Sequence, residues 1–118
     1  MTERPAPQAG GEDIAVDVLD HAVMVRPTGE MDIDSAPSLG RALTAALAHA
    51  SPAKVVVIDC SRLVFCDSSA LNTLLGARRT AVEAGSAIRL ESPNDQLRSL
   101  LRMTGTLSLF PLGQESSD

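Results

Sequence analysis

The chain has 118 residues, of which 44% are hydrophobic and 21% are charged, and its aromatic residues are two phenylalanines, with no tryptophan and no tyrosine. This length suits one domain that folds without a metal or a disulfide, and the scarcity of aromatic rings argues against stacking on single-stranded nucleic acid. Fifteen acidic against ten basic residues give a formal charge of −5, which is the wrong sign for binding DNA, RNA or an anionic membrane.

Composition divides the chain into a domain with two tails. Residues 1–12 and 113–118 are rich in proline, glycine or polar residues without apolar periodicity, so both are predicted to be flexible. Over residues 13–112 the pattern changes every ten to fifteen residues, as it does where strands alternate with helices. We therefore predict a single α/β domain, with a central mixed sheet of four to five strands flanked by three to four helices.

The first half of this domain predicts two strands, a helix and a third strand. Apolar residues alternate with polar ones over 14–18, and an apolar run follows at 22–25, which indicates an antiparallel pair joined by a tight turn. After an interruption, Asp34 or Ser35 is expected to cap a helix. The β-branched run at 55–58 indicates a central strand. The helix carries an apolar stripe that should face the sheet, made of Ala36, Leu39, Leu43, Ala46, Leu47 and Ala50.

The second half predicts a connector and four further elements. Residues 60–69 form the connector, which leads into a second helix that a glycine ends. Residues 86–91 indicate a short strand. Ser92 is expected to cap a third helix, with Pro93 at its first position, and residues 107–110 are expected to form a last edge strand.

Targeting, disulfide and metal signals are lacking. No stretch reaches the roughly 18 to 20 consecutive apolar residues of a membrane helix, and the N-terminus lacks the basic-then-apolar order of a signal peptide, so we expect a cytoplasmic protein. The spacing of Cys60 and Cys66 matches neither a zinc site nor a redox motif, and we expect reduced thiols, at least one of them buried. His21 and His49 lie far apart in the sequence, so no metal or other cofactor is implied.

The most informative segment is FCDSSAL, residues 65–71. It places a carboxylate and two hydroxyls, those of Asp67, Ser68 and Ser69, where a helix is predicted to begin. A helix N-terminus has free N–H donors and partial positive charge, so it favours an anionic group. One N-cap explains only one of the three residues, and a phosphoryl group on a serine that is not the cap would be tolerated there.

Two strings carry a resemblance to a known family. FCDSSALNTLLGARR, residues 65–79, resembles the signature of the anti-anti-sigma factor (STAS domain) family, in which Asp-Ser-Ser or Asp-Ser-Thr precedes Gly-Leu and a helix with a Gly-x-x-Arg-like pattern. TGEMDIDSAP, residues 28–37, resembles that family's second landmark, a Gly-Glu-Leu/Ile-Asp turn before the first helix. The resemblance covers about residues 13–112, and it implies a STAS-like fold and a regulator rather than an enzyme.

The resemblance also implies a switch and the residues that operate it. In the family, the unphosphorylated protein binds an anti-sigma factor that is also a serine kinase and thereby releases a sigma factor. Phosphorylation of the serine after the Asp, here Ser68, blocks the binding, and a serine phosphatase restores it. Ala70 stands where the family usually has Gly, and the charge of Arg78 or Arg79 suits contact with an acidic partner. The expected partner-binding residues are Asp32, Asp67, Ser68, Ser69, Ala70, Asn72, Gly76 and Arg79.

Gly76 matches the signature and needs an explanation of its own. A glycine inside a helix costs about 1 kcal/mol relative to alanine, so we expect something to pack closely there. Packing of the helix on the sheet and contact with a partner are both open.

Two other functions remain alternatives. The first is a STAS scaffold in another signalling complex, whose serine is not phosphorylated. The second is a small enzyme or nucleotide-binding protein that holds phosphate in the loop at Asp67–Ser69. The lack of a Gly-x-x-x-x-Gly-Lys-Ser/Thr loop weakens the second alternative, and Lys54 is the chain's single lysine.

Overall fold

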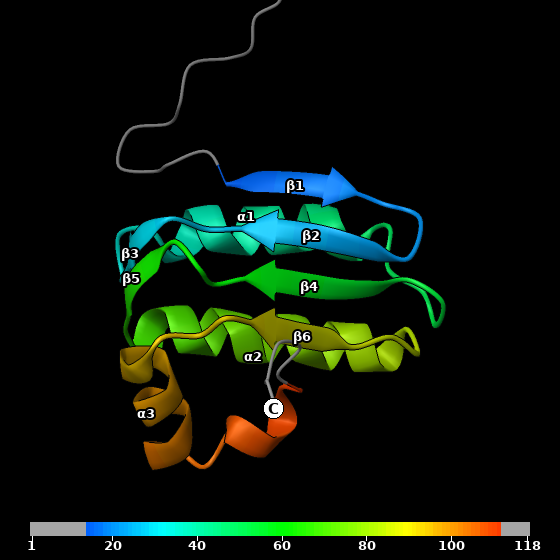
Figure 1. Cartoon of the computed structure of the whole chain (residues 1–118). Helices are drawn as coiled ribbons and strands as arrows, with labels where there is room; N and C mark the ends of the chain where they lie inside the picture. The colour runs from blue at the N-terminus through cyan, green and yellow to red at the C-terminus, as the bar shows by residue number, and fades with distance from the viewer. Residues whose placement is uncertain (1–13, 112–118) are drawn as a thin grey trace, which may run out of the picture.

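The computed structural model describes residues 14–111, so the two predicted flexible tails, 1–12 and 113–118, lie outside the described residues. Figure 1 shows the layered arrangement of the elements. None of the described helices is long and apolar enough to cross a membrane. In chain order the elements are β1 (Ala15–Val18), β2 (Ala22–Arg26), β3 (Gly29–Met31), α1 (Ala36–Leu47), β4 (Val55–Asp59), β5 (Leu63–Cys66), α2 (Ser68–Glu83), β6 (Ile88–Glu91), α3 (Asp95–Met103) and the 3₁₀ helix η1 (Leu107–Leu109).

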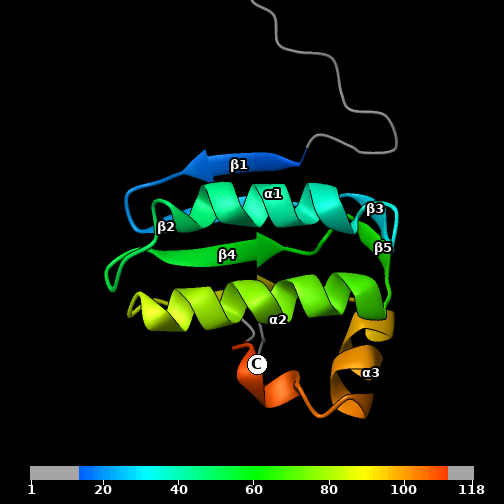
Figure 2. The same ribbon diagram turned by 180° about the vertical axis from the view of Figure 1, so that it is seen from behind.

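The main sheet is four-stranded and mixed, which confirms the predicted fold class. Its order is β1-β2-β4-β6, with β1 antiparallel to β2 and the other neighbours parallel. The antiparallel pair is the predicted one, with Val16 opposite Val25, and the β-branched strand β4 is central, as predicted. Helices α1 and α2 lie side by side over one face of the sheet, as the two opposite views show (Figures 1 and 2).

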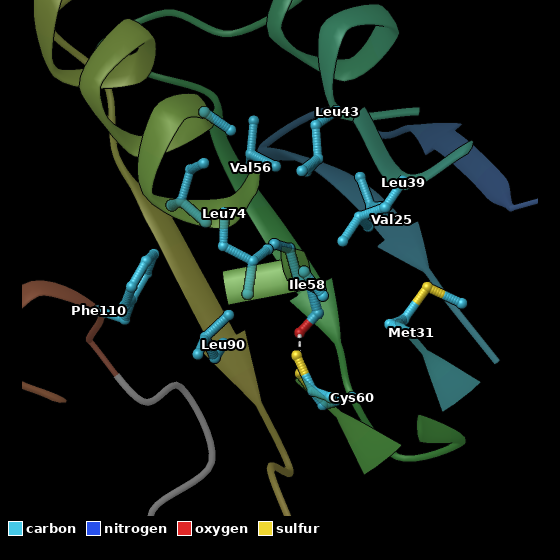
Figure 3. Close-up of a cluster of buried hydrophobic side chains, with 14 of the residues drawn as sticks. Val25, Met31, Leu39, Leu43, Val56, Ile58, Cys60, Leu74, Leu90 and Phe110 are labelled. Atoms are coloured by element: carbon cyan, nitrogen blue, oxygen red, sulfur yellow. Dashed lines mark hydrogen bonds between the residues drawn. The ribbon is translucent and has the colours of Figure 1, made fainter. Parts of the chain in front are cut away.

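The core between this face and the two helices is built from aliphatic side chains. Leu39 and Leu43 of α1 and Leu74 of α2 are at most 3% exposed, and they lie over Val25 and Val56 of the sheet (Figure 3). Burying one such side chain contributes about 1.5–3 kcal/mol. The apolar stripes therefore hold both helices on the sheet. The position of α2 on the sheet in turn sets where its first residue lies.

Helix α1 begins at the predicted place, but the predicted side-chain cap is wrong. Ser35 is the N-cap residue, and its hydroxyl makes no capping hydrogen bond. The hydroxyl instead turns back into the preceding loop, where it accepts from the backbone N–H of Asp32 at 3.1 Å, and its one proton is shared between the Glu30 carbonyl and Asp32 Oδ1, each at 2.9 Å. Asp34 is exposed and does not cap the helix either. The helix ends before Ala50, the last residue of the predicted stripe.

Two short strands form where only connectors are predicted. β3 and β5 pair in parallel as a separate two-stranded sheet. Gly29 is paired with Leu63 and Glu30 with Phe65, so β5 carries one extra residue, Val64, at a bulge. Val64 and Phe65 are consequently both exposed instead of alternating between core and solvent. A strand this short with a broken alternation has no period by which it can be recognised.

The C-terminal region departs from the prediction at two points. Asn94 caps helix α3, and its side chain accepts from the Leu97 N–H at 2.9 Å. The predicted start at Ser92 is therefore wrong, because Ser92 has a φ of 56° and lies in the turn before the helix. The predicted strand over 107–110 is also wrong, since η1 occupies it. Phe110 is 1% exposed, so the apolar residues there fill the core instead of pairing in the sheet.

Candidate functional site

Two parallel strands end side by side at the point where α2 begins (Figure 1). Met31 of β3 is paired with Cys66 of β5, and the backbone N–H of Asp67 donates to the Met31 carbonyl at 3.1 Å. Asp32 and Asp67 are the next residues of these two strands. The structure thus brings together, at adjoining strand ends, the two aspartates that come from separate sequence motifs.

Asp67 is the N-cap of α2 and leaves the next residue exposed. Its Oδ1 accepts from the backbone N–H of Ser69 at 2.9 Å and from that of Ala70 at 3.1 Å. Ser68 is the first residue of the helix and is exposed. Within residues 14–111 its hydroxyl forms no hydrogen bond. The cap therefore occupies two N–H donors that would otherwise bind an anion, while the Ser68 hydroxyl stays accessible.

Asp32 has a different task in the adjoining loop. Its Oδ1 accepts from the Ser35 hydroxyl at 2.9 Å and from the backbone N–H groups of Ser35 at 3.1 Å and Asp34 at 3.0 Å. These bonds, with that of the Ser35 hydroxyl foremost, lower the pKa of the Asp32 carboxyl. The side chain is ionised at neutral pH and holds the turn between β3 and α1 in shape.

Helix α3 holds the strand that leads into the site. Gln96 bonds both backbone groups of Cys66, because its Oε1 accepts from the N–H at 2.9 Å and its Nε2 donates to the carbonyl at 2.8 Å. Asn94 donates from its Nδ2 to the carbonyls of Leu63 and Val64, at 3.2 Å each. Sequence reasoning missed both side chains, because each bridges about thirty positions of chain and no local pattern signals such a contact.

A scan against family models matches residues 14–110 to the model described as "Mlab, STAS domain". The chain belongs to the STAS domain family. The expectation from the two sequence strings is thereby confirmed, and the acidic strand ends and the exposed serine are parts of this STAS domain. No curated protein matches the chain.

Solved structures similar to this STAS domain include anti-sigma factor antagonists. One from Mycobacterium paratuberculosis has 26% sequence identity and a TM-score of 0.75, with 86% of this chain and 85% of the other covered. The antagonist SpoIIAA in its unphosphorylated form has 20% identity and a TM-score of 0.70, with 86% and 89% covered. The Bacillus cell fate determinant SpoIIAA in its phosphorylated form has 21% identity and a TM-score of 0.64, with 86% and 92% covered.

The other expected partner-binding residues of the STAS domain fall into two groups. Asn72 and Arg79 are exposed on α2, and Ser69 is half-buried. Ala70 is fully buried in the core, so it lies away from the surface that a partner would touch. Its backbone is helical, and the one non-glycine residue with positive φ in the described range is Ser92. The fold therefore does not require glycine at position 70.

Gly76 lies in a groove between α1 and α2 of about 210 Å³. Apart from its chain neighbours and the backbone of its own helix turn, a Cβ added at Gly76 would meet no described atom within 4 Å. Close packing inside the domain, one of the two explanations for this glycine, is therefore wrong. At Gly40, across the groove, an added Cβ would meet Thr73 Cγ2 at 3.6 Å, which is ordinary contact.

Both cysteines of the STAS domain are buried and free. Burial, and to a lesser degree the Asp67 charge, raises the pKa of the Cys66 thiol to about 11. Burial raises the pKa of the Cys60 thiol to about 12. Both therefore act as small apolar side chains rather than as reactive thiolates. Among the described residues, no group of three or more His, Cys, Asp or Glu side chains could hold a metal ion.

Proposed function

We propose that this chain is an anti-sigma factor antagonist that acts in the bacterial cytoplasm. It binds an anti-sigma factor that is also a serine kinase and so releases a sigma factor; phosphorylation of Ser68 blocks the binding, and a serine phosphatase restores it. The observation that carries the proposal is the exposed Ser68 hydroxyl directly after the capping Asp67. A similar fold in SpoIIAA, which has an unphosphorylated and a phosphorylated form, supports it.

The charges around Ser68 explain how such a switch works. A phosphate adds about −1.5 to −2 charges, and it would stand beside the carboxylates of Asp67 and Asp32. The Asp67 cap already satisfies two helix N–H groups, so the helix terminus offers the phosphate little compensation. A partner surface that receives a neutral hydroxyl would have to desolvate this charge. Each increment of about 1.4 kcal/mol in that cost weakens binding tenfold. No rearrangement of the domain is needed.

The proposed partner surface follows from the exposure of the α2 residues. Asn72 and Arg79 are exposed along the helix that begins at Ser68, and Gly76 lies in the groove beside them. Ala70 contributes through the position of the helix instead of through contact. The full proposed surface comprises Asp32, Asp67, Ser68, Ser69, Asn72, Gly76 and Arg79.

In this proposal the chain is a binding protein and not an enzyme. A nucleophilic serine needs a histidine base within hydrogen-bond reach. His21 directly precedes β2 and His49 lies before β4, both at the N-terminal ends of parallel strands, whereas Ser68 follows the C-terminal end of β5. The phosphate-binding alternative is weakened in a similar way, because Asp67 occupies the helix N–H groups that a bound phosphate would need.

The test begins with capture of partners from the native host's lysate on three forms of the protein: wild type, Ser68→Asp and Ser99→Asp. Ser99 is exposed on α3 and serves as the matched control. The proposal expects an anti-sigma factor kinase to bind the wild type and the control and to be lost with Ser68→Asp. The purified kinase should then label the wild type but not Ser68→Ala.

Two results would count against the switch. Equal capture of one partner by all three forms would favour the scaffold alternative. Labelling that persists in Ser68→Ala would move the modification to Ser69 or to another serine.

A further inference from the structure

Three exposed apolar side chains lie on the two chain segments that adjoin Ser68. Of the seven large hydrophobic side chains exposed in residues 14–111, Ile33 is 70% exposed, Val64 64% and Phe65 40%. Ile33 directly follows Asp32, and Phe65 lies two residues before Asp67. These three side chains, here called the β3–β5 patch, therefore lie on the two segments that meet at the paired strand ends beside the proposed switch.

Two of the three patch side chains are exposed because of the bulge in strand β5. The extra residue in β5 turns both Val64 and Phe65 outward, whereas regular pairing would bury one of the two. Asn94 donates to the Val64 carbonyl, and Gln96 holds the backbone of Cys66. The exposed side chains are thus presented on a strand that α3 fixes in place.

We propose that the β3–β5 patch is the apolar anchor with which this domain binds the anti-sigma factor kinase. The inference rests on the proposed function and names the residues that supply its affinity. A kinase that brings its active site to the Ser68 hydroxyl must cover the adjoining strand ends, which include Ile33 and Phe65. A few side chains near the centre of an interface supply most of its binding energy, and aromatic residues such as phenylalanine are enriched in interface cores.

The two carboxylates at the site already have hydrogen-bond partners within the domain. The Asp67 carboxylate is engaged with two backbone N–H groups, and the Asp32 carboxylate is engaged with Ser35 and Asp34. The patch therefore provides apolar contact area, while Ser68 provides the position at which added charge disrupts it.

The test measures the dissociation constant of the purified kinase, captured as above, for four proteins by calorimetry. They are the wild type, Ile33→Thr, Phe65→Thr and the control Val82→Thr. Val82 is 51% exposed near the far end of α2 and so matches the patch in exposure but not in place. We expect each patch variant to weaken binding by about tenfold or more and the control to change it by less than about twofold. Thermal unfolding checks the fold, and if Phe65→Thr unfolds, Ile33→Thr alone decides.

The outcomes separate the patch from the switch. If both patch variants bind like the wild type while Ser68→Asp still weakens binding, the patch proposal is overturned and the proposed function stands. If the wild type binds no anti-sigma factor kinase, the proposed function fails and the patch proposal falls with it. If the wild type dimerises in sedimentation experiments and Phe65→Thr makes it monomeric, the patch joins two copies of this chain and the kinase is not its occupant.

Discussion

Gln96 and Cys66 are joined by two hydrogen bonds, through which the side-chain amide of Gln96 satisfies both the backbone N–H and the backbone carbonyl of Cys66. An amide can do this because it carries a donor and an acceptor side by side. Cys66 is followed directly by the capping Asp67 and by Ser68. The orientation of helix α3 is thereby coupled to the position of the proposed phosphorylation site.

Replacing Gln96 should weaken the fold and the presentation of Ser68 together. In Gln96→Ala both backbone groups of Cys66 lose their partner, and an unsatisfied, partly buried polar group costs about 1–3 kcal/mol. We expect urea denaturation to show a loss of this size. The exposed neighbour Ser99→Ala should change stability by less than about 0.5 kcal/mol. An unchanged stability in Gln96→Ala would mean that water replaces the amide.

Removing the cap at Asp67 should destabilise helix α2 in a way that a second capping residue repairs. Asp67→Ala removes the acceptor for the Ser69 and Ala70 N–H groups, and the loss of a cap costs about 1 kcal/mol. Asp67→Ser keeps a side-chain oxygen at the N-cap and should recover most of this. Denaturant midpoints measure both variants. Equal destabilisation in the two would show that the charge of Asp67, and not its capping bond, matters.

Gly76→Ala should stabilise the domain. Its Cβ has open space, and alanine favours a helix over glycine by about 1 kcal/mol, so the melting temperature should rise. Gly29→Ala is the contrasting variant, because Gly29 has a φ of +75° and a side chain there costs about 1–2 kcal/mol.

The same variant tests whether a partner approaches the groove. If Gly76→Ala is more stable and binds the captured kinase less well, the kinase comes close to the helix at this point. Stabilisation with unchanged binding would leave Gly76 outside the interface.

The domain should lose stability in alkali through its two thiols. The folded pKa values are about 11 for Cys66 and about 12 for Cys60, against a reference value of 9.0. Between the reference pKa and the folded pKa values, the thiols of the unfolded state lose protons that the thiols of the folded state keep. The stability of the fold therefore falls as the pH rises above about 9. The chain has no tyrosine and one lysine, which leaves few other groups to titrate there.

A pH series of urea denaturations from pH 8 to about 11 measures this effect. The double variant Cys60→Ala/Cys66→Ala should flatten most of the slope, although it also lowers stability at every pH by removing buried atoms. Native thiols should react slowly with iodoacetamide at pH 8 and quickly in denaturant. Fast alkylation of the native protein would contradict the buried, protonated state of both cysteines.

The predictable parts of the fold are those with a repeated local signal. The β-branched run of β4 and the period of the apolar stripes in α1 and α2 indicate their elements, and the structure has all three. Residue type alone predicts side-chain caps at Asp34 or Ser35 and at Ser92, and none of these side chains caps a helix. Whether a hydroxyl bonds the helix or the preceding loop depends on the backbone path, which neighbouring elements set.

The sequence by itself determined the α/β class, the family, and Ser68 as the candidate for modification, because these depend on residue types at short spacing. Only the tertiary structure decided that β3 and β5 pair, that Asp32 stands beside Asp67, and that Asn94 and Gln96 hold β5. Each of these contacts joins segments that are distant in the chain. Each is made by hydrogen bonds in which at least one partner is a backbone group. Backbone groups are the same in every residue, so no pattern of side chains announces which of them will meet.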